Sequence, residues 1–256
     1  VSNTIILFPF AGLLVKTACA IVKEKKSERT EDDVETDILR HLDDRLLESP
    51  SFAIDTAEKE VINMGKVAIA NLKIATAALT DRNEASSNSP FENETKLNHL
   101  DTVLTDYLVK INNLSLNDSQ HLLVKNLFYT IGDIERIGDH AENLAELAQT
   151  VIRTGSPFSE SGEEDLKKIS GAALQSVETA VESREHKELS KVRQAARYEE
   201  AVDSLEEELK ELHMERLSNR ECSTESGVIF LDAISNYERI ADHARNIAGY
   251  VKEEIQ

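Results

Sequence analysis

Two stretches of this sequence place acidic side chains four residues apart, a spacing at which side chains are neighbours on a helix. Glu135 and Asp139 form one Glu-x-x-x-Asp pair, and Glu238 and Asp242 form another. Each step of four residues advances about 40° around a helix, so the acids of each stretch follow one slowly winding line. The apolar residues fall roughly a quarter turn away. We therefore expect these acids at the edge of the core.

Spacing alone leaves three interpretations of these pairs. The first is an ordinary solvated face, whose acids form ion pairs with Arg136 and Arg239. The second is general acid–base catalysis, although the sequence supplies no nucleophile or phosphate cradle beside the acids. The third is coordination of hard metal ions by carboxylates on facing helices. Like charges four residues apart repel each other, yet both stretches keep the pair. Metal binding and the solvated face are equally supported at this point.

The helices that precede the two stretches carry further acids. Glu199 and Asp203 form a third Glu-x-x-x-Asp pair, and we expect its counterpart to be Asp101 followed by Thr105, where the second acid is lost. If these helices pack with their acidic faces together, one site assembles four carboxylates and the other at least three. That density favours a metal site.

Histidines follow the same motif but do not fit a di-iron pattern. His140 and His243 lie five residues after the motif glutamates, whereas ferritin-type sites use Glu-x-x-His. By their angle around the helix we expect both on an exposed flank, away from the ligands.

The residues around these motifs predict an all-α chain. Apolar residues recur every three or four positions almost without interruption from residue 51 onward. With 9 Gly and 4 Pro in 256 residues, the chain lacks the turn residues that a strand-rich fold needs. The predicted helices span about 52–80, 97–114, 119–153, 163–183, 187–217 and 224–253.

The motif stretches also reveal an internal duplication. ERIGDHAENLA at 135–145 and ERIADHARNIA at 238–248 share eight of eleven residues at an offset of 103. This match predicts two copies of a three-helix unit, 51–154 and 160–256. Side by side, the two units make a six-helix bundle.

The charge balance limits the partners. The chain has 29 Lys and Arg against 48 Asp and Glu, a formal net charge of −19. This excess argues against nucleic acid, which needs clustered basic residues, and favours metal ions or basic protein surfaces. Cys19 and Cys222 are far apart and lack metal-ligand spacing, so we expect free thiols in a reducing compartment.

The N-terminal segment has a different character. Residues 4–22 form an apolar run interrupted only by Lys16, just long enough to span a membrane. The run is followed by three lysines within residues 23–26, which predict a cytoplasmic exit. We therefore expect residues 1–25 to end a membrane domain with its last transmembrane helix, and residues 26–50 to be a charged linker. The alternative is an amphipathic helix docked on the bundle.

Two parts of this chain resemble known protein families. IERIGDHAENLAE and YERIADHARNIAG resemble the signature of PhoU-type domains, which consist of two three-helix repeats, and the resemblance covers roughly 52–256. SNTIILFPFAGLLVK at 2–16 resembles the last membrane segment of type II sodium-phosphate cotransporters, whose bacterial members carry a PhoU-like domain at the C-terminus. Together they imply a PhoU-like regulatory domain of a sodium-dependent phosphate symporter, which is not an enzyme.

The PhoU resemblance implies a multinuclear cluster of iron or another divalent cation. Carried over position by position, it assigns the metal ligands Glu135, Asp139, Glu238 and Asp242, with Glu199, Asp203 and Asp101 from the second helices. Thr105 departs from the family pattern, so the first cluster is expected to be smaller, weaker or absent.

The resemblance also implies partners and a location. The partners are the transporter membrane domain, phosphate and sodium through the full-length protein, and a second copy of the chain in a homo-oligomer. The location is the bacterial inner membrane, with residues 26–256 cytoplasmic. Two other functions remain open: a free-standing soluble PhoU-like adaptor in phosphate signalling, and a carboxylate-bridged metalloenzyme.

Overall fold

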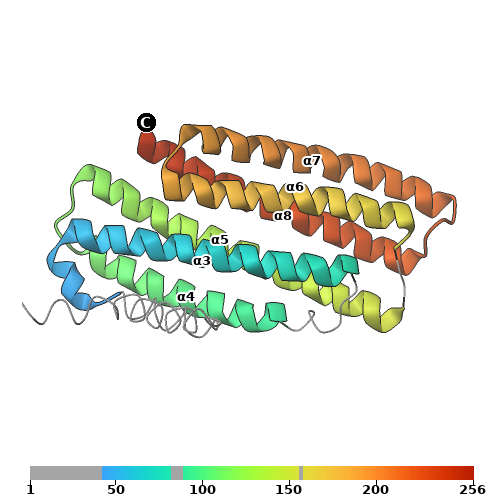
Figure 1. Cartoon of the computed structure of the whole chain (residues 1–256), viewed down its shortest axis with the longest axis horizontal. Coiled ribbons are helices and arrows are strands. Elements are labelled where there is room, and N and C mark those ends of the chain that lie inside the picture. The colour runs from blue at the N-terminus through green and yellow to red at the C-terminus, as the bar shows by residue number, and fades with distance from the viewer. Residues whose placement is uncertain (1–41, 82–88, 156–157) are drawn as a thin grey trace, which may run out of the picture. The chain divides into compact units, whose positions relative to one another are not determined.

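A computed structural model describes residues 42–81, 89–155 and 158–256, and these residues form long helices joined by short connections (Figure 1). A short 3-10 helix, η1 (Asp44–Glu48), precedes six α-helices. Their bounds are α3 (Pro50–Asp81), α4 (Ser89–Asn112), α5 (Asp118–Thr154), α6 (Glu160–His186), α7 (Leu189–Ser218) and α8 (Thr224–Ile255). The prediction of an all-α, six-helix bundle is confirmed for the described part of the chain.

The six helices form two three-helix units. In the first unit α3, α4 and α5 all contact one another, and in the second unit α6, α7 and α8 do the same. The units are joined by α5 against α8 and by α3 against α6 (Figure 1). The two motif helices, α5 and α8, therefore lie side by side in the middle of the bundle.

Local sequence sets where the motif helices begin and end. Asn117 caps α5 by accepting from the Gln120 backbone N–H, and the Gln120 side chain accepts a hydrogen bond from the Asn117 backbone N–H. Gly155 ends α5 in the left-handed region, at φ 62°. Ser223 caps α8 by accepting from the Ser226 N–H.

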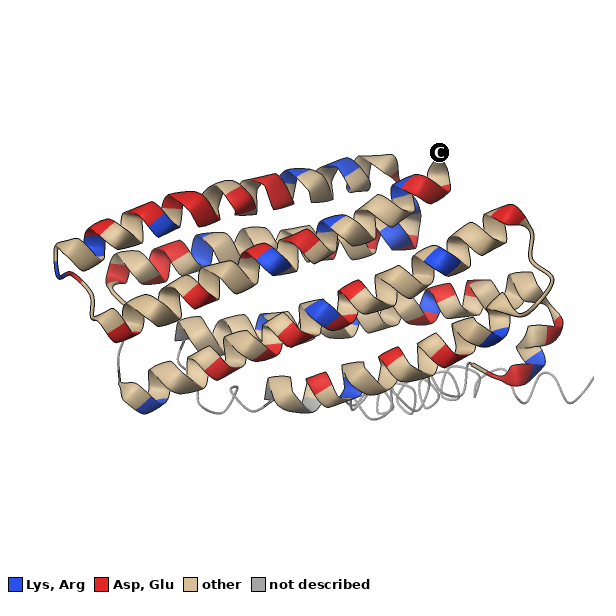
Figure 2. Ribbon diagram, turned by 180° about the vertical axis from the view of Figure 1, so that it is seen from behind, with Lys and Arg blue, Asp and Glu red and all other residues tan. Residues whose placement is uncertain are grey.

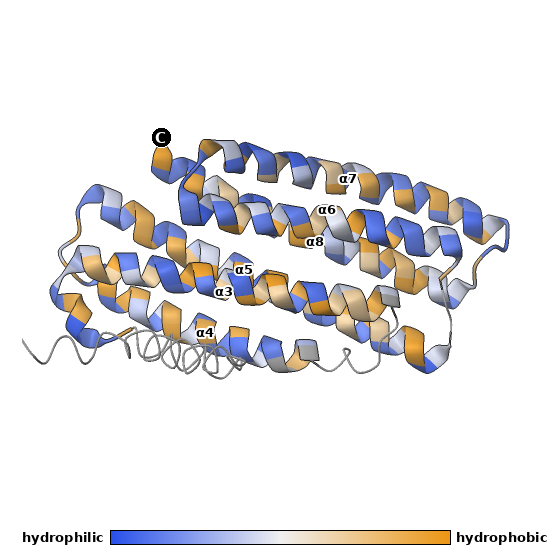
Figure 3. Cartoon of the chain, in the orientation of Figure 1, coloured by the Kyte–Doolittle hydropathy of each residue, from blue (hydrophilic) through white to orange (hydrophobic). Residues whose placement is uncertain are grey.

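The core preserves the duplication. Polar and apolar residues alternate along each helix with helical periodicity (Figure 3), and the apolar side chains at matching positions of α5 and α8 are buried. The matching buried pairs are Ile137 and Ile240, Ala141 and Ala244, and Leu144 and Ile247. Because α5 and α8 bury matching faces, their acids also lie on matching faces. Each acidic face is directed toward a neighbouring helix of its own unit.

The membrane helix predicted at residues 4–22 lies outside the described residues, as does most of the predicted linker. Among the helices of the described part, none is both long and apolar enough to cross a membrane. The compact unit of described residues begins at Leu42, so it includes the end of the segment predicted as a linker.

Candidate metal centre

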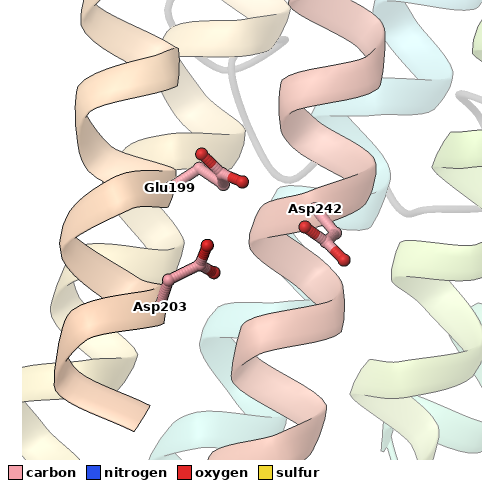
Figure 4. Close-up of side chains that lie close together, drawn as sticks. All are labelled: Glu199, Asp203 and Asp242. Atoms are coloured by element: carbon pink, nitrogen blue, oxygen red, sulfur yellow. The ribbon is translucent and has the colours of Figure 1, made fainter. Parts of the chain in front are cut away.

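Three carboxylates from two helices meet in the second unit. Glu199 and Asp203 lie one turn apart on α7, and Asp242 lies on the facing side of α8 (Figure 4). One oxygen from each of the three lies within 4.8 Å of the other two. Oxygen ligands of divalent cations lie about 2.0–2.6 Å from the ion, so this spacing suits three ligands around one cation.

The environment of this cluster leaves oxygen atoms uncompensated. Glu199 is buried, whereas Asp203 and Asp242 are accessible to solvent. Arg245 donates from Nη1 to Glu199 Oε1 at 2.6 Å. In contrast, Glu199 Oε2 and Asp203 Oδ1 are buried with no hydrogen-bond partner among the described residues. Buried carboxylate oxygens in this state need a proton or a cation.

The pKa values follow from this environment. Burial raises the pKa of Glu199, and the hydrogen bond from Arg245 partly offsets this rise. Burial and then the charge of Asp242 raise the pKa of Asp203. Both shifts arise mainly because burial disfavours an ionised carboxylate, and the neighbouring negative charges add to this cost, which a bound cation would relieve.

The acidic face continues along α7 and α8. Burial raises the pKa of Glu238, and the charges of Asp242 and Glu206 raise it further. Glu206 is buried and forms an ion pair with Lys210. Glu206 was not predicted as part of the site, although it lies three residues after Asp203 on the same face of the helix.

Glu94 of α4 dominates the corresponding site in the first unit. Its side chain is 3% exposed, and both carboxylate oxygens lack a hydrogen-bond partner among the described residues. Burial raises the pKa of Glu94 to about 7, with further contributions from the charges of Asp139, Glu142 and Glu135. Glu94 was not predicted as a ligand because the helix was expected to begin at residue 97, whereas α4 begins at Ser89, and because Glu94 is not part of a Glu-x-x-x-Asp pair.

Gly138 provides the space for Glu94. A Cβ atom on Gly138 would lie 2.5 Å from Glu94 Oε2 and 2.8 Å from Leu97 Cδ1. The second unit has Ala241 at the matching position, and there the buried glutamate faces Arg245 instead. The glycine thus allows the buried carboxylate to approach the backbone of α5 closely.

The position of Glu94 beside α5 corrects the predicted alignment of α4 with α7, the second helices of the two units. Besides burial, the charge of Asp139 on the motif helix raises the pKa of Glu94, just as the charge of Asp242 raises the pKa of Glu199. Glu94 is therefore the counterpart of Glu199, and the expected match of Asp101 with Glu199 is wrong by seven residues. Seven residues make almost two full turns, so both alignments present the same face of α4.

Asp101 remains beside the motif in the corrected alignment. Its charge raises the pKa of Glu135, as the charge of Glu206 raises that of Glu238. Burial raises the pKa of Asp101 itself. Asp101 is thus the counterpart of Glu206, one step further along the acidic face.

Ion pairs account for part of the first motif. Arg136 contacts Asp139 at 3.1 Å and Glu135 at 3.5 Å, as the solvated-face interpretation predicted. Arg136 is 61% exposed, so these contacts are weak and leave Glu94 without a counter-charge.

The two motif histidines lie at the α5–α8 interface, so the prediction of an exposed flank is wrong. The rings of His140 and His243 stack with centroids 5.8 Å apart. His243 Nδ1 hydrogen-bonds Asp133 at 2.7 Å, and His140 Nδ1 hydrogen-bonds Asn236 at 2.9 Å. Each histidine thereby binds the opposite motif helix, which fixes the register between the two units.

Together these features define a class of protein: a duplicated three-helix bundle whose motif helices carry acids into interhelical clusters. The PhoU domain family matches residues 61–148 and 166–251, one match for each unit, and the chain belongs to this family.

Individual relatives agree with this assignment. The chain is 27% identical over 197 residues to the phosphate-specific transport system accessory protein PhoU homolog of Xylella fastidiosa, covering 74% of this chain and 79% of that protein. It is 25% identical over 131 residues to PhoU homolog 1 of Thermotoga maritima, which bears the same accessory-protein name. That match covers 49% of this chain and 56% of the Thermotoga protein, little more than half of its length.

Solved structures share the fold. PhoU from Pseudomonas aeruginosa superimposes with a TM-score of 0.74 at 22% identity, covering 79% of this chain and 97% of that one. The phosphate transport system regulatory protein PhoU from Streptococcus pneumoniae gives a TM-score of 0.73 at 17% identity, covering 80% and 96%.

Proposed function

We propose that this chain regulates phosphate transport as a PhoU-type accessory protein and binds divalent cations through its carboxylate clusters. The family membership supports the regulatory role, because the Xylella and Thermotoga relatives are named as accessory proteins of phosphate-specific transport systems. The observation that carries the cation-binding role is the group formed by Glu199, Asp203 and Asp242, with its unpartnered buried oxygens.

The residues present fit a divalent cation. Glu199, Asp203 and Asp242 would hold it in the second unit, with Glu238 next along the same face. A set made only of carboxylates suits hard cations, so Mg²⁺, Mn²⁺ and Fe²⁺ are the first candidates. When bound, the cation would neutralise the acidic face and supply positive charge there. A multinuclear cluster of iron or another divalent cation remains part of this proposal.

The ligands proposed for the first unit are Glu135 and Asp139, with Asp101 close to Glu135. Glu94 joins this set because it faces Asp139 and has no hydrogen-bond partner among the described residues. In the corrected alignment Asn98, and not Thr105, stands where the second unit has Asp203, so the expectation that Thr105 replaces a ligand is wrong.

Metal analysis of the purified chain tests the cation-binding role. After dialysis against Fe²⁺ or Mn²⁺ under anaerobic conditions, we expect bound metal in the wild type and a loss of the second-unit ion in D203N/D242N. The variant E207Q/E208Q removes two exposed charges from α7 and is the matched control. Equal metal content in all three proteins would show that this cluster does not bind metal and is an ordinary acidic face.

Phosphate uptake in the source organism tests the regulatory role. Deleting the gene should change uptake at high external phosphate, and the wild-type gene should restore it. If D203N/D242N restores regulation as well as the wild type does, regulation is independent of the metal site. Unchanged uptake in the deletion strain would contradict the regulatory role itself.

Experiment can distinguish two forms of this regulator, a separate accessory protein and a domain attached to a transporter. The comparisons favour a separate accessory protein. Attachment to a sodium-phosphate symporter rests on residues 2–16, which lie outside the described residues. Fractionation of the native protein distinguishes the forms: carbonate extracts a peripheral adaptor, whereas a chain anchored by residues 4–22 stays in the membrane pellet.

A further inference from the structure

A groove of about 450 Å³ runs between the beginning of α7 and the end of α8. Its apolar floor consists of Leu189, Val192 and Ala196 from α7, with Ala248 and Gly249 from α8. This groove lies outside the proposed ligand sets, so cation binding gives it no role.

The floor of the groove suits a packed helix. A Cβ atom on Gly249 would meet no other group within 4 Å, so the floor is open at that point. Ala196 and Ala248 are also small, and small residues permit close approach of another helix. Leu189 is 36% exposed at the edge of the floor and offers apolar surface to a ligand.

The charges around the floor are all of one sign. Every charged side chain that lines the groove is basic: Arg193, Arg245 and Lys252. Neither Arg193 nor Lys252 has an ion-pair partner in the part of the chain that the structure describes, and Arg245 remains 55% exposed while it binds Glu199. Figure 2 shows basic positions at the end of α7 nearest the C-terminus, in a chain whose net charge is −19.

The first unit lacks this arrangement of charge. At the 103-residue offset, Arg245, Gly249 and Lys252 correspond to Glu142, Glu146 and Gln149. The basic charge that α8 gives to the groove is therefore not shared by the matching positions of α5 and does not follow from the duplicated fold.

We propose that this groove is a docking site for an acidic amphipathic helix of a partner protein. The apolar face of that helix would pack on Leu189 and Ala196, and its flanking carboxylates would meet Arg193 and Lys252. Charge complementarity argues for an acidic partner, and the apolar floor argues for a helix over nucleic acid, whose phosphates gain nothing from apolar contact. The proposal goes beyond the proposed function, because it requires neither bound metal nor a phosphate transporter.

Peptide binding to the full chain tests this proposal. The probe is a fluorescein-labelled helix of about 18 residues, roughly five turns, with leucines on one face and glutamates on both flanks. Its matched control carries lysines in place of the glutamates. By fluorescence anisotropy we expect the glutamate peptide to bind and the lysine peptide not to bind.

The variant R193E/K252E should weaken binding of the glutamate peptide at least about tenfold, since two attractive contacts become repulsive. R153E/K167E changes the same charge outside the groove and should bind like the wild type.

Three results would overturn the proposal. The first is equal binding of both peptides, or an unchanged affinity in R193E/K252E with native circular dichroism. The second is concentration-dependent dimerisation in sedimentation experiments that R193E/K252E abolishes, which would make a second copy of the chain the occupant. The third is binding to vesicles of phosphatidylcholine and phosphatidylserine that the same variant abolishes, which would assign the groove to a membrane surface.

Discussion

Glu94 in the first unit and Glu199 in the second occupy matching positions but meet opposite charges on the facing motif helix. Glu199 accepts a hydrogen bond from Arg245, whereas Glu94 lies near Glu142, the residue that matches Arg245 at the 103-residue offset. Both glutamates are almost fully buried. The duplication thus preserved the position of the buried acid and reversed the charge opposite it.

This difference gives the two sites different electrostatic states. In the corrected alignment Asn98 stands where the second unit has Asp203, so the first site loses one acid on the second helix and gains Glu142 on the motif helix. The second site is partly neutralised by Arg245 and keeps its three carboxylates together. In the first site exposed Arg136 pairs with Glu135 and Asp139, but Glu94 has no such partner among the described residues, so Glu94 depends more on a proton or a cation.

The largest change in the free energy of unfolding is expected from R245E, which places a glutamate in the second site where the first site has Glu142. Glu199 would lose its counter-charge and remain buried, and removing one partner of a buried pair costs about 3–5 kcal/mol. Because Arg245 is 55% exposed, we expect the lower end, about 3 kcal/mol. Urea unfolding at pH 8 in EDTA measures the change. R153E is the control for charge reversal on an exposed surface, and an equal loss in both variants would refute the comparison.

E94Q is expected to raise the free energy of unfolding, by less than R245E lowers it. The pKa of Glu94 is raised to about 7 from an ordinary value of 4.5, so the folded chain binds this proton more tightly than the unfolded chain. Wild-type stability is therefore lost as the pH rises from 4.5 through 7, and E94Q removes that loss. The full shift corresponds to about 3 kcal/mol, and relaxation and water penetration around the buried group reduce it, so in EDTA we expect E94Q to stabilise the chain by about 2 kcal/mol at pH 8 and to have little effect at pH 4.5.

The control for E94Q is E207Q, which removes an exposed carboxylate from α7. It should leave the free energy of unfolding unchanged at both pH values. If E94Q were equally stabilising at pH 4.5 and pH 8, its effect would not come from the charge of Glu94.

E142R sharpens the comparison by giving the first site the arginine of the second. Glu142 is partly exposed, so the gain is modest, and we expect about 1 kcal/mol of stabilisation at pH 8 in EDTA. The double variant E94Q/E142R supplies the decisive measurement. If the introduced arginine acts through Glu94, the two gains will not add, whereas additive gains would show that they are independent.

Much of the fold could be predicted from sequence, because helical periodicity and the duplicated motif both act over many residues. The predicted helix bounds lie within three residues of the observed ones except at α4, which begins at Ser89 and not at residue 97. Part of the site was also predictable: the spacing of Glu199, Asp203 and Asp242 marked them, the PhoU resemblance implied that they are metal ligands, and the structure brings their oxygens together. Local spacing suffices where both ligands of a pair lie on one helix.

The rest of the site depends on how helices are placed against each other. A slip of seven residues along α4 preserves the face it presents, so sequence did not reveal that Glu94, and not Asp101, matches Glu199. The position of His140 was missed for a similar reason. Its angle around α5 was clear from sequence, but which flank of α5 is covered by α8 is set by packing between the units.

The smallest effect concerns a buried histidine of the second unit that has no histidine counterpart in the first. In the corrected alignment His213 stands where α4 has Leu108, and both side chains are buried. His213 stacks on Phe230 with ring centroids 4.6 Å apart, and burial, together with the charge of Arg216, lowers its pKa. The unfolded chain takes up this proton near pH 6.5 while the folded chain resists it, so stability is lost as the pH falls below 6.5.

H213L should remove this loss, and the leucine at the matching position of the first unit shows that the bundle accommodates that side chain. On going from about pH 7.5 to pH 5.5, on either side of the ordinary histidine pKa, we expect H213L to gain more unfolding free energy than the wild type gains, by an amount smaller than the E142R effect. H121L replaces an exposed histidine and should keep the wild-type difference. Because the acids of both units favour low pH and His213 opposes it, the second unit should gain less stability on acidification than the first. Hydrogen exchange of α4 and α7 at the two pH values measures this directly, and equal protection changes would show that His213 does not separate the units.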